Sequence, residues 1–379
     1  MRQQRFPGNR RRLILITACL VLIMQAAVRL APSGHAAPPP KELSDQQFWS
    51  LSKEFSEDDG VFRSDNLLSN ETSFQYVIPN LLKGTKQGRV YLGVGPEQNF
   101  TYIAALKPAM AFIIDIRHGN LDVHLMYKAL FELSKDRAEF VSRLFSRKRP
   151  NGLTDKSSVT EIFNAYLAAD GNKEMFEENL RAIQDVLIKK HGFPLTSGDI
   201  DGIRWALSNY YQFGPAINYS SSLSASTPPE IVGAIGGGFG NNGVTYASLM
   251  TAEDGLGQNR SFLASQENFD FLKDLESRNL VIPVVGDFGG NKAIRAVATY
   301  LKSIDAMVSA FYLSNVEQFL GQGGKWRTFC ACTATLPLDD TSFFIRSGRG
   351  RNIFGGGGVQ NSSISKMFED LTPCLETAH

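Results

Sequence analysis

The chain has 379 residues, of which 43% are hydrophobic, so it can bury a sizeable core in one large domain or two smaller ones. Its 39 basic and 38 acidic residues give a net charge of +1 at pH 7, but six of the arginines and none of the acids lie in residues 1–37. The rest of the chain has 33 basic and 38 acidic residues, and this mildly acidic balance argues against a nucleic acid as partner.

Residues 1–37 are predicted to be a signal peptide or a signal anchor and not part of the fold. Three arginines, Arg10–Arg12, precede the apolar run Leu13–Val28, and small residues and prolines follow. The alternatives are cleavage near Ala36 or Ala37 and retention as an anchor, for which the run is short. We therefore expect an exported protein that is either periplasmic or attached to the membrane through this segment, facing outside the cytoplasm.

Residues 38–83 are predicted to form an N-terminal arm that carries a helix. Ser44 is placed to cap a helical segment from Asp45 to Phe55. The aromatic residues of this segment are expected to pack against the main domain, and Ile78–Leu82 leads towards the first strand of that domain.

The stretch from Arg89 to Arg117 shows the clearest pattern in the chain. The predicted elements are a strand at Val90–Leu92, a helix at Gln98–Leu106 and a strand at Ala111–Ile114. Continuous apolar strands that alternate with helices are typical of a parallel sheet covered on both faces. We therefore predict an α/β fold of the Rossmann-like type, with a mostly parallel sheet and helices on both faces, for residues 84–346.

Residues at the ends of these two strands predict a site for a nucleoside-type ligand. Gly93 and Gly95 allow an unusual backbone conformation and a close approach of the ligand. The helix that follows presents free N–H groups near Glu97 and Asn99. Asp115 follows Gly93 by 22 residues, near the spacing at which an acid binds the ribose of a nucleotide. These five residues are candidate cofactor-binding residues.

The segment YLGVGPEQNF, followed by Asp115, resembles the nucleoside-binding half of the class I S-adenosylmethionine-dependent methyltransferase-like superfamily. More specifically, it resembles an uncharacterised bacterial family that carries this segment. The resemblance implies S-adenosylmethionine as cofactor, with Asp115 on its ribose. Two positions depart from the superfamily pattern, because the acid expected near Tyr91 is absent and Glu97 stands at the third glycine position. An acid there would repel a pyrophosphate, which argues against a dinucleotide.

Two residues just past the second strand are further candidates. Arg117 and His118 are expected to contact the ligand, because ligands bind beyond the C-terminal ends of the strands in open α/β sheets. His118 is also one of two candidate catalytic residues. His124 lies in a helix predicted at Leu121–Leu133 and is expected to pack rather than to react.

Residues from about 134 to 245 interrupt the alternation and are predicted to form a helical insertion that covers the site and shapes a substrate pocket. Helices are expected at Asn172–Lys190 and Asp199–Tyr211. The cluster Arg147–Arg149 is expected to be solvated. Ser220–Gly243 is rich in Ser, Pro and Gly, which predicts a mobile loop or lid, and it lacks the Gly-Lys-Ser/Thr of a P-loop.

The alternation returns with a helix at Ser261–Asn279 and a strand at Leu280–Val285, which is followed by Asp287 and Phe288. The resemblance places the residues after the fourth strand beside the methyl group. It therefore makes Asp287 the second catalytic candidate, and Asp287 and Phe288 candidate cofactor contacts. The alternative is that Asp287 caps the next helix. The C-terminal ends of parallel strands lie at one edge of the sheet, so Asp287 and Asp115 are expected to face one cleft.

The last part of the chain contains two strand-like segments, Trp326–Thr335 and Thr341–Ile345, and a C-terminal tail at 347–379. The two segments are expected to supply the antiparallel edge strands typical of the fold that the chain resembles. The cysteines after the signal segment are Cys330, Cys332 and Cys374. Either one disulfide to Cys374 or buried thiols would account for them. Cys-x-Cys without two further ligands is not a zinc site, and no metal site is expected.

Together these features predict a methyltransferase-like protein that depends on S-adenosylmethionine and acts on an unidentified small-molecule ligand. S-adenosylmethionine is a cytosolic cofactor, so the export signal is an objection to this prediction. The protein could be exported already folded around its cofactor, the start codon could be misplaced, or the domain could have lost catalysis. The last case gives the alternative, an exported non-catalytic module of the same fold that binds a small ligand. An NAD-dependent oxidoreductase is a third alternative, which Glu97 disfavours.

Overall fold

The computed structural model describes residues 39–62, 65–219, 221, 244–349 and 360–376. These residues belong to the unit Pro38–His379. The predicted export signal, the Gly-rich loop and the Gly/Arg-rich part of the tail lie outside the described residues. Within the described ranges, no helix combines the length and the apolar character needed to cross a membrane.

A six-stranded sheet forms the centre of the fold, with the strand order β3-β2-β1-β4-β5-β6. Strands β1 to β5 run parallel, and β6 pairs antiparallel with β5. The strands are β1 Val90–Gly93, β2 Met110–Asp115, β3 Val281–Val285, β4 Val308–Ser314, β5 Phe343–Arg349 and β6 Gln360–Lys366. The chain runs outward from β1 through β2 to β3 and then returns to the other side of β1. This is a Rossmann-like α/β arrangement, so the predicted fold class is confirmed.

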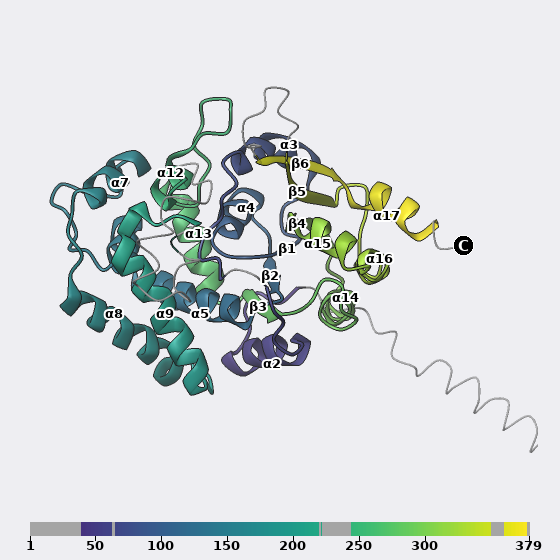
Figure 1. The fold of residues 1–379 in the computed structure, drawn as a ribbon, viewed down its shortest axis with the longest axis horizontal. Helices are drawn as coiled ribbons and strands as arrows, with labels where there is room; N and C mark the ends of the chain where they lie inside the picture. Colours follow the sequence, from purple (N-terminus) through teal and green to yellow (C-terminus); the bar gives the residue numbers. More distant parts are fainter. Residues whose placement is uncertain (1–38, 63–64, 220, 222–243, 350–359, 377–379) are drawn as a thin grey trace, which may run out of the picture. The chain divides into compact units, whose positions relative to one another are not determined.

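Helices cover both faces of this sheet (Figure 1). On one face lie α4 Gln98–Leu106, α5 His118–Leu133 and α13 Gln266–Ser277, and on the other lie α14 Ala293–Ser303 and α16 Trp326–Thr333. Every position of β1, β2 and β3 is buried. Because both faces are covered, these strands are apolar along most of their length instead of alternating with polar residues.

The N-terminal arm closes one edge of the sheet. Helix α2, Asp45–Phe55, begins at a capping box in which Ser44 and Gln47 exchange hydrogen bonds, as the sequence predicts. Ser52 Oγ donates to the carbonyl of Pro283 in β3 at 2.7 Å. Pro283 has no N–H to offer a further strand, which suits an edge position. The arm therefore protects an edge that would otherwise be open to pairing.

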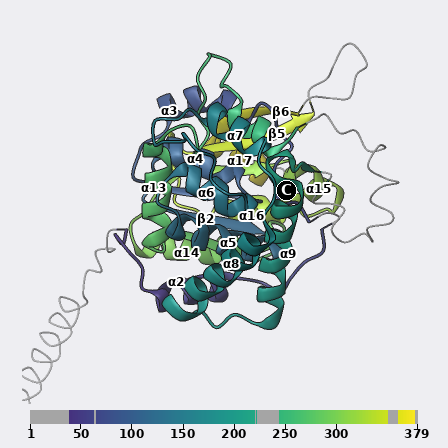
Figure 2. The same ribbon diagram turned by 90° about the vertical axis from the view of Figure 1, so that its left-hand side faces the viewer.

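The helical insertion packs against α5 on the side away from the sheet, and Figure 2 looks onto it. It consists of α6 Arg137–Phe145, α7 Val159–Leu167, α8 Lys173–Gln184 with a π-helical continuation Asp185–Lys190, α9 Ser197–Phe213 and, after the Gly-rich loop, α12 Tyr246–Thr251. Thr196 caps α9 through a reciprocal capping box with Asp199. Helix α9 makes the most extensive contact with α5, so the insertion is anchored directly on the central domain.

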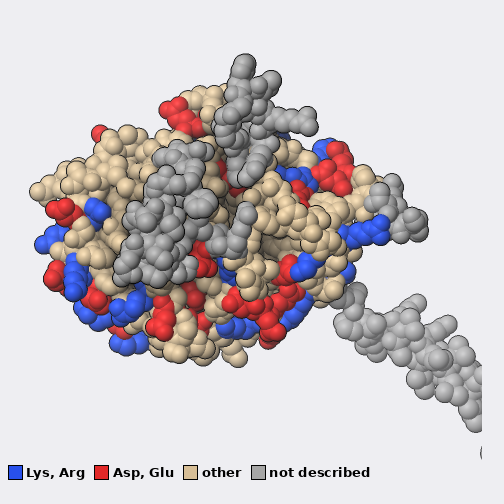
Figure 3. Space-filling model, in the orientation of Figure 1, with Lys and Arg blue, Asp and Glu red and all other residues tan. Residues whose placement is uncertain are grey.

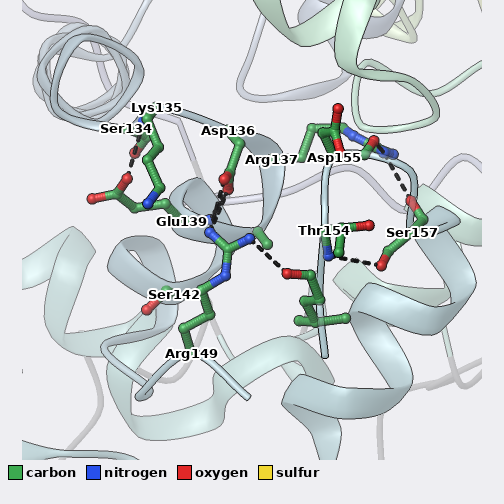
Figure 4. A network of polar contacts seen from close by, with 12 residues as sticks. Ser134, Lys135, Asp136, Arg137, Glu139, Ser142, Arg149, Thr154, Asp155 and Ser157 are labelled. Atoms are coloured by element: carbon green, nitrogen blue, oxygen red, sulfur yellow. Dashed lines mark hydrogen bonds and ion pairs between the residues drawn. The ribbon is translucent and has the colours of Figure 1, made fainter. Parts of the chain in front are cut away.

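The sequence predicts that the basic cluster Arg147–Arg149 is solvated, but Arg149 forms an ion pair and a hydrogen bond within the protein. Arg149 Nη1 lies 2.8 Å from both carboxylate oxygens of Asp136, and its Nη2 donates to the carbonyl of Leu153 (Figure 4). Arg137 donates to the carbonyls of Asp155 and Ser157 beside it. These bonds tie the start of α6 to the loop that follows it, and the pairing with Asp136 could not be read from local spacing.

The C-terminal part differs from the prediction in three ways. The segment Thr341–Ile345 does not supply an antiparallel edge strand, because β5 runs parallel to β4 and is followed in the sheet by β6. Residues 326–333 form the helix α16 and not a strand, because Phe329, Cys330 and Thr333 recur at helical spacing and are buried. The predicted tail contains β6 and the helix α17, Met367–Glu376, so the α/β domain extends beyond residue 346. A disulfide joins Cys330 in α16 to Cys374 in α17, and Cys332 is a free, buried thiol.

Candidate functional site

A cavity of about 490 Å³ lies at the C-terminal edge of the parallel strands. It is lined by residues that follow β1, β2, β3 and β4, which include Gly95, Asp115, Arg117, Asp287, Phe288 and Ser314. Strands β1 and β4 are the neighbours between which the chain reverses its direction of travel across the sheet. Ligands of open α/β sheets bind at such a switch point, and the volume is in the range of small-molecule sites.

The turn after β1 is held in place by the side chain of Asn99, which does not line the cavity. Asn99 Nδ2 donates to the carbonyls of Val94, Gly95 and Pro96 at 3.0, 3.0 and 2.8 Å. A Cβ on Gly93 would lie 1.9 Å from Asn99 Oδ1, so only glycine leaves room for this side chain. Asn99 is fully buried and neither Asn99 nor Gly93 lines the cavity. Their predicted role as direct ligand contacts is replaced by one in positioning the turn.

Gly95 is the part of this turn that faces the cavity. Its φ of +76° is a conformation that favours glycine, and a Cβ there would meet no atom within 4 Å. His124 Nε2 donates to the Gly95 carbonyl at 2.9 Å, and burial lowers the pKa of His124 to about 4. The expectation that His124 packs is confirmed, and its neutral ring adds a second support to the turn.

Asp115 lines the cavity, but its carboxylate is already paired. Arg117 donates to it from the backbone N–H at 2.9 Å, from Nε at 3.0 Å and from Nη2 at 2.8 Å. Both side chains are buried, and Arg117 Nη1 also donates to the carbonyl of Asn66. A carboxylate can accept about four hydrogen bonds. Asp115 therefore has room for one ribose hydroxyl, whereas the family pattern implies an acid that binds two.

Sequence reasoning missed Glu71, a buried acid in the cavity wall. Glu71 Oε1 accepts hydrogen bonds from the hydroxyls of Tyr312 at 2.9 Å and Ser314 at 2.5 Å, and Oε2 accepts one from Gln98 Nε2 at 2.9 Å. Burial raises the pKa of Glu71 above its ordinary value, against the effect of these donors. Its sequence neighbourhood is merely polar, so no local signal identifies it.

Ser314 stands at the end of β4 with a φ of +50°, an uncommon conformation for a residue other than glycine. Such conformations are often found where a site needs a particular geometry. Here the turn directs the Ser314 hydroxyl onto Glu71, in the wall of the cavity.

Glu97 does not contact the cavity, contrary to the prediction. It is 1% exposed, its Oε1 accepts a hydrogen bond from the backbone N–H of Ser69 at 3.1 Å, and burial raises its pKa to about 8. Its Oε2 is buried and accepts no hydrogen bond from the described residues. Glu97 is therefore a buried acid that does not line the cavity. It is largely protonated near neutral pH because of its raised pKa.

Asp287 lines the cavity, but not at the position that the resemblance implied. It follows β3, which lies at the edge of the sheet and is separated from β1 by β2, whereas β4 pairs directly with β1. Its Oδ1 accepts from the N–H of Gly289, and its Oδ2 forms an ion pair with Lys325 at 2.5 Å. Glu57, not Asp287, accepts the N–H groups at the start of α14. The prediction that Asp287 follows the fourth strand of the superfamily pattern and the alternative that it caps the next helix are therefore both wrong.

Phe288 lines the cavity wall next to Asp287. It packs against Phe311 and Phe329, with ring centroids 5.2 and 6.0 Å apart. It is 4% exposed, so it offers an apolar surface to a ligand without being mobile.

His118 lies outside the cavity lining, although it follows Arg117 directly. Its Nε2 is 2.6 Å from Asp199 Oδ1 in α9, and its backbone N–H donates to Asp59. The helix α5 begins at His118 and turns the side chain towards the helical insertion. A catalytic role in the cavity is therefore not supported by its position.

Two segments of the chain, residues 67–190 and 245–365, match a family described as Domain of unknown function (DUF7790). The chain belongs to this family. The matched segments contain β1 to β5, most of β6 and the turns after β1 to β4, so the cavity is built largely from family residues. No curated protein matches the chain.

The charges in the cavity of this DUF7790 protein are mostly compensated. Arg117 neutralises Asp115, and Lys325 neutralises Asp287. Opposite charges are likewise interspersed on the described surface that Figure 3 shows. Glu71 has hydroxyl and amide partners but no cation bonded to it in the described residues. It is therefore the cavity acid best placed to meet a cationic group or to accept a proton.

Proposed function

We propose that the cavity binds a nucleoside-type cofactor, with S-adenosylmethionine as the first candidate, and that the protein is methyltransferase-like. The observation that carries the proposal is the position of the cavity at the switch point between β1 and β4, with the Gly95 turn and Asp115 at the ends of adjacent strands. This is where the ribose and the nearby groups of nucleotides bind in Rossmann-like sheets.

The residues present fit such a molecule at three points. Gly95 has free space in front of its backbone, Asp115 retains capacity for one hydroxyl, and Glu71 offers a buried acid at the β4 side. S-adenosylmethionine supplies a methyl group on a positively charged sulfur, and an acidic wall favours a cation. With a protonated acceptor, Glu71 is the candidate base, because burial raises its pKa towards the range useful for proton transfer.

A second function, a non-catalytic small-ligand-binding module, is favoured by a specific observation. The acids that the sequence predicts for catalysis and ribose binding, Asp287 and Asp115, are both held in ion pairs, and His118 points away from the cavity. An exported module that only binds would need no free base. The two proposals share the cavity and differ in whether a methyl group is transferred.

The proposal is tested by measuring first the binding of S-adenosylmethionine and then its turnover. We expect native mass spectrometry of the purified protein to show co-purified S-adenosylmethionine or its demethylated product, and calorimetry to show one site per chain. NAD serves as the comparison ligand and should bind more weakly. Failure to bind any adenosine-containing molecule would contradict both forms of the proposal. Tight binding without turnover on cell-envelope extracts would select the binding module.

A further inference from the structure

A second group of ionisable side chains lies where helix α9 meets the start of α5. His118 is the first residue of α5, Asp122 lies one turn further, and Asp199 lies in the first turn of α9. One donor atom from each of these side chains lies within 4.8 Å of the other two. None of the three lines the cavity described above, so the group is separate from the proposed cofactor site.

Asp122 is the residue whose environment points to a ligand. It is only 3% exposed, and its Oδ1 accepts no hydrogen bond from any described residue. This oxygen lies 3.8 Å from His118 Nε2. Burying a carboxylate oxygen without a partner is unfavourable. A bound cation next to this oxygen would relieve that penalty.

The opposite helix is shaped to accommodate this carboxylate. Gly202 lies in the middle of α9, where glycine is unfavourable for a helix. A Cβ at this position would lie 2.1 Å from Asp122 Oδ2. Any other residue would therefore displace the carboxylate, and the glycine keeps it between the two helices.

We propose that His118, Asp122 and Asp199 form a binding site for a divalent transition-metal cation of the Zn²⁺ or Mn²⁺ type. One imidazole nitrogen and two carboxylate oxygens suit such ions, whereas Mg²⁺ and Ca²⁺ prefer oxygen ligands alone. Tetrahedral ligands about 2.0–2.1 Å from zinc lie roughly 3.3 Å apart. The separations of 2.6 and 3.8 Å from His118 Nε2 bracket that value, and the three ligand atoms all lie within 4.8 Å of one another.

The surroundings orient the ligands and leave one side of the site open. Thr196 donates from its backbone N–H and its hydroxyl to Asp199 Oδ2, at 2.6 and 2.8 Å, which leaves Oδ1 directed at His118. Hydrogen bonds of this kind fix the orientation of metal ligands. The His118 side chain is 33% exposed, whereas those of Asp122 and Asp199 are 5% and 1% exposed. Water can therefore complete the coordination from the His118 side, as at metal sites with an open position.

The alternative is that no cation binds here and that the His118 ring and the Asp199 carboxylate share only their hydrogen bond, with Nε2 and Oδ1 2.6 Å apart. The two arrangements predict opposite behaviour on adding metal. A metal ion on His118 Nε2 would have to replace this hydrogen bond, so only the proposed site predicts stoichiometric binding of the ion.

The experiment uses the full chain, freed of metal with a chelator and then titrated by calorimetry with ZnCl₂, MnCl₂ and MgCl₂ in separate runs. We expect one Zn²⁺ or Mn²⁺ per chain, with MgCl₂ at least tenfold weaker. Asp122→Asn and His118→Ala should each weaken the binding of Zn²⁺ or Mn²⁺ at least tenfold. Asp201→Asn, the same change at an exposed position of α9, should bind like the wild type.

Thermal unfolding distinguishes a loss of metal binding from a loss of folding. Asp122→Asn conserves the side-chain volume and should leave the metal-free protein folded. The metal should raise the melting temperature of the wild type and of Asp201→Asn but not of Asp122→Asn. Two outcomes would overturn the proposal. One is the absence of stoichiometric binding to the wild type, and the other is binding that survives in both Asp122→Asn and His118→Ala. Neither outcome depends on whether the cavity binds S-adenosylmethionine, which is titrated separately in the presence of chelator.

Discussion

The guanidinium of Arg117 and the carboxylate of Asp115 form a bidentate ion pair in the wall of the cavity, with Nε–Oδ1 and Nη2–Oδ2 distances of 3.0 and 2.8 Å. The pair is buried, with 10% and 6% of the two side chains exposed. Asp115 is thus as much the partner of a buried cation as a ligand-binding acid. A change at either residue leaves the other charge uncompensated.

The first prediction tests this double role. Asp115→Asn should lower the free energy of unfolding by about 3–5 kcal/mol, because it leaves Arg117 buried without its counter-charge. Asp115→Asn combined with Arg117→Gln should recover most of the stability. Ligand affinity should fall in both variants, since the acceptor for the ribose is weakened in each. Urea unfolding and calorimetry measure the two quantities. Full affinity in the stable double variant would remove Asp115 from the ligand site.

A second prediction concerns the backbone approach at Gly95. Gly95→Leu should weaken ligand binding, because the side chain would project into the cavity. Gly88→Leu is the matched control, since Gly88 also has a positive φ, at +73°, and open space around its Cβ, but does not line the cavity. Both variants should lose about 1–2 kcal/mol of stability through backbone strain. Calorimetry with S-adenosylmethionine should find weakened binding in Gly95→Leu alone, and equal affinities would contradict the assignment.

The third prediction separates enzyme from binding module through two buried acids. Glu71 lines the cavity and Glu97 does not, although each is about 1% exposed. In an enzyme, Glu71→Gln should lower turnover by about 10²-fold or more if Glu71 is the base, while Glu97→Gln should leave turnover near that of the wild type. The assay is formation of the demethylated cofactor. Turnover that survives Glu71→Gln would exclude Glu71 as the base.

A fourth prediction follows from the pKa of Glu97, which burial raises to about 8. Between about pH 4.5 and pH 8 the unfolded chain has lost this proton and the folded chain retains it, so stability falls as the pH rises. The slope is about 1.4 kcal/mol per pH unit for one such group. Glu97→Gln should remove that part of the slope. The free energy of unfolding of the variant should therefore rise relative to that of the wild type between pH 5 and pH 8. Urea unfolding at four pH values measures the difference. Parallel curves for the two proteins would show that Glu97 is ionised in the folded state.

The fifth prediction concerns the disulfide between Cys330 and Cys374, which closes a loop with a sequence separation of 44. Loop-closure entropy predicts a loss of about 4 kcal/mol on replacing both residues by serine. Reductant should destabilise the wild type by a similar amount and leave the double-serine variant unchanged. A thiol titration of the denatured, non-reduced protein should find Cys332, together with Cys19 when residues 1–37 are retained. Three or more free thiols would refute the pairing.

Local signals in the sequence were sufficient for the elements around the cavity. The bounds of α4, Gln98–Leu106, and of α2, Asp45–Phe55, agree with the prediction because caps, turn residues and apolar runs act within a few residues. The sequence also predicted the mostly parallel sheet and the position of Gly95 and Asp115 at one edge of it, because the C-terminal ends of parallel strands lie at the same edge.

Only the tertiary structure decided which side chains meet. Glu71 reaches Tyr312 and Ser314 across 241 and 243 residues of sequence, and His118 reaches Asp199 across 81. Strand order depends on long-range contacts too, so the sequence identified the strand before Asp287 but not its place in the sheet. Local composition determines the conformation of a segment. Which charges face one another, and which of them remain without a partner, is determined by the packing of the whole domain.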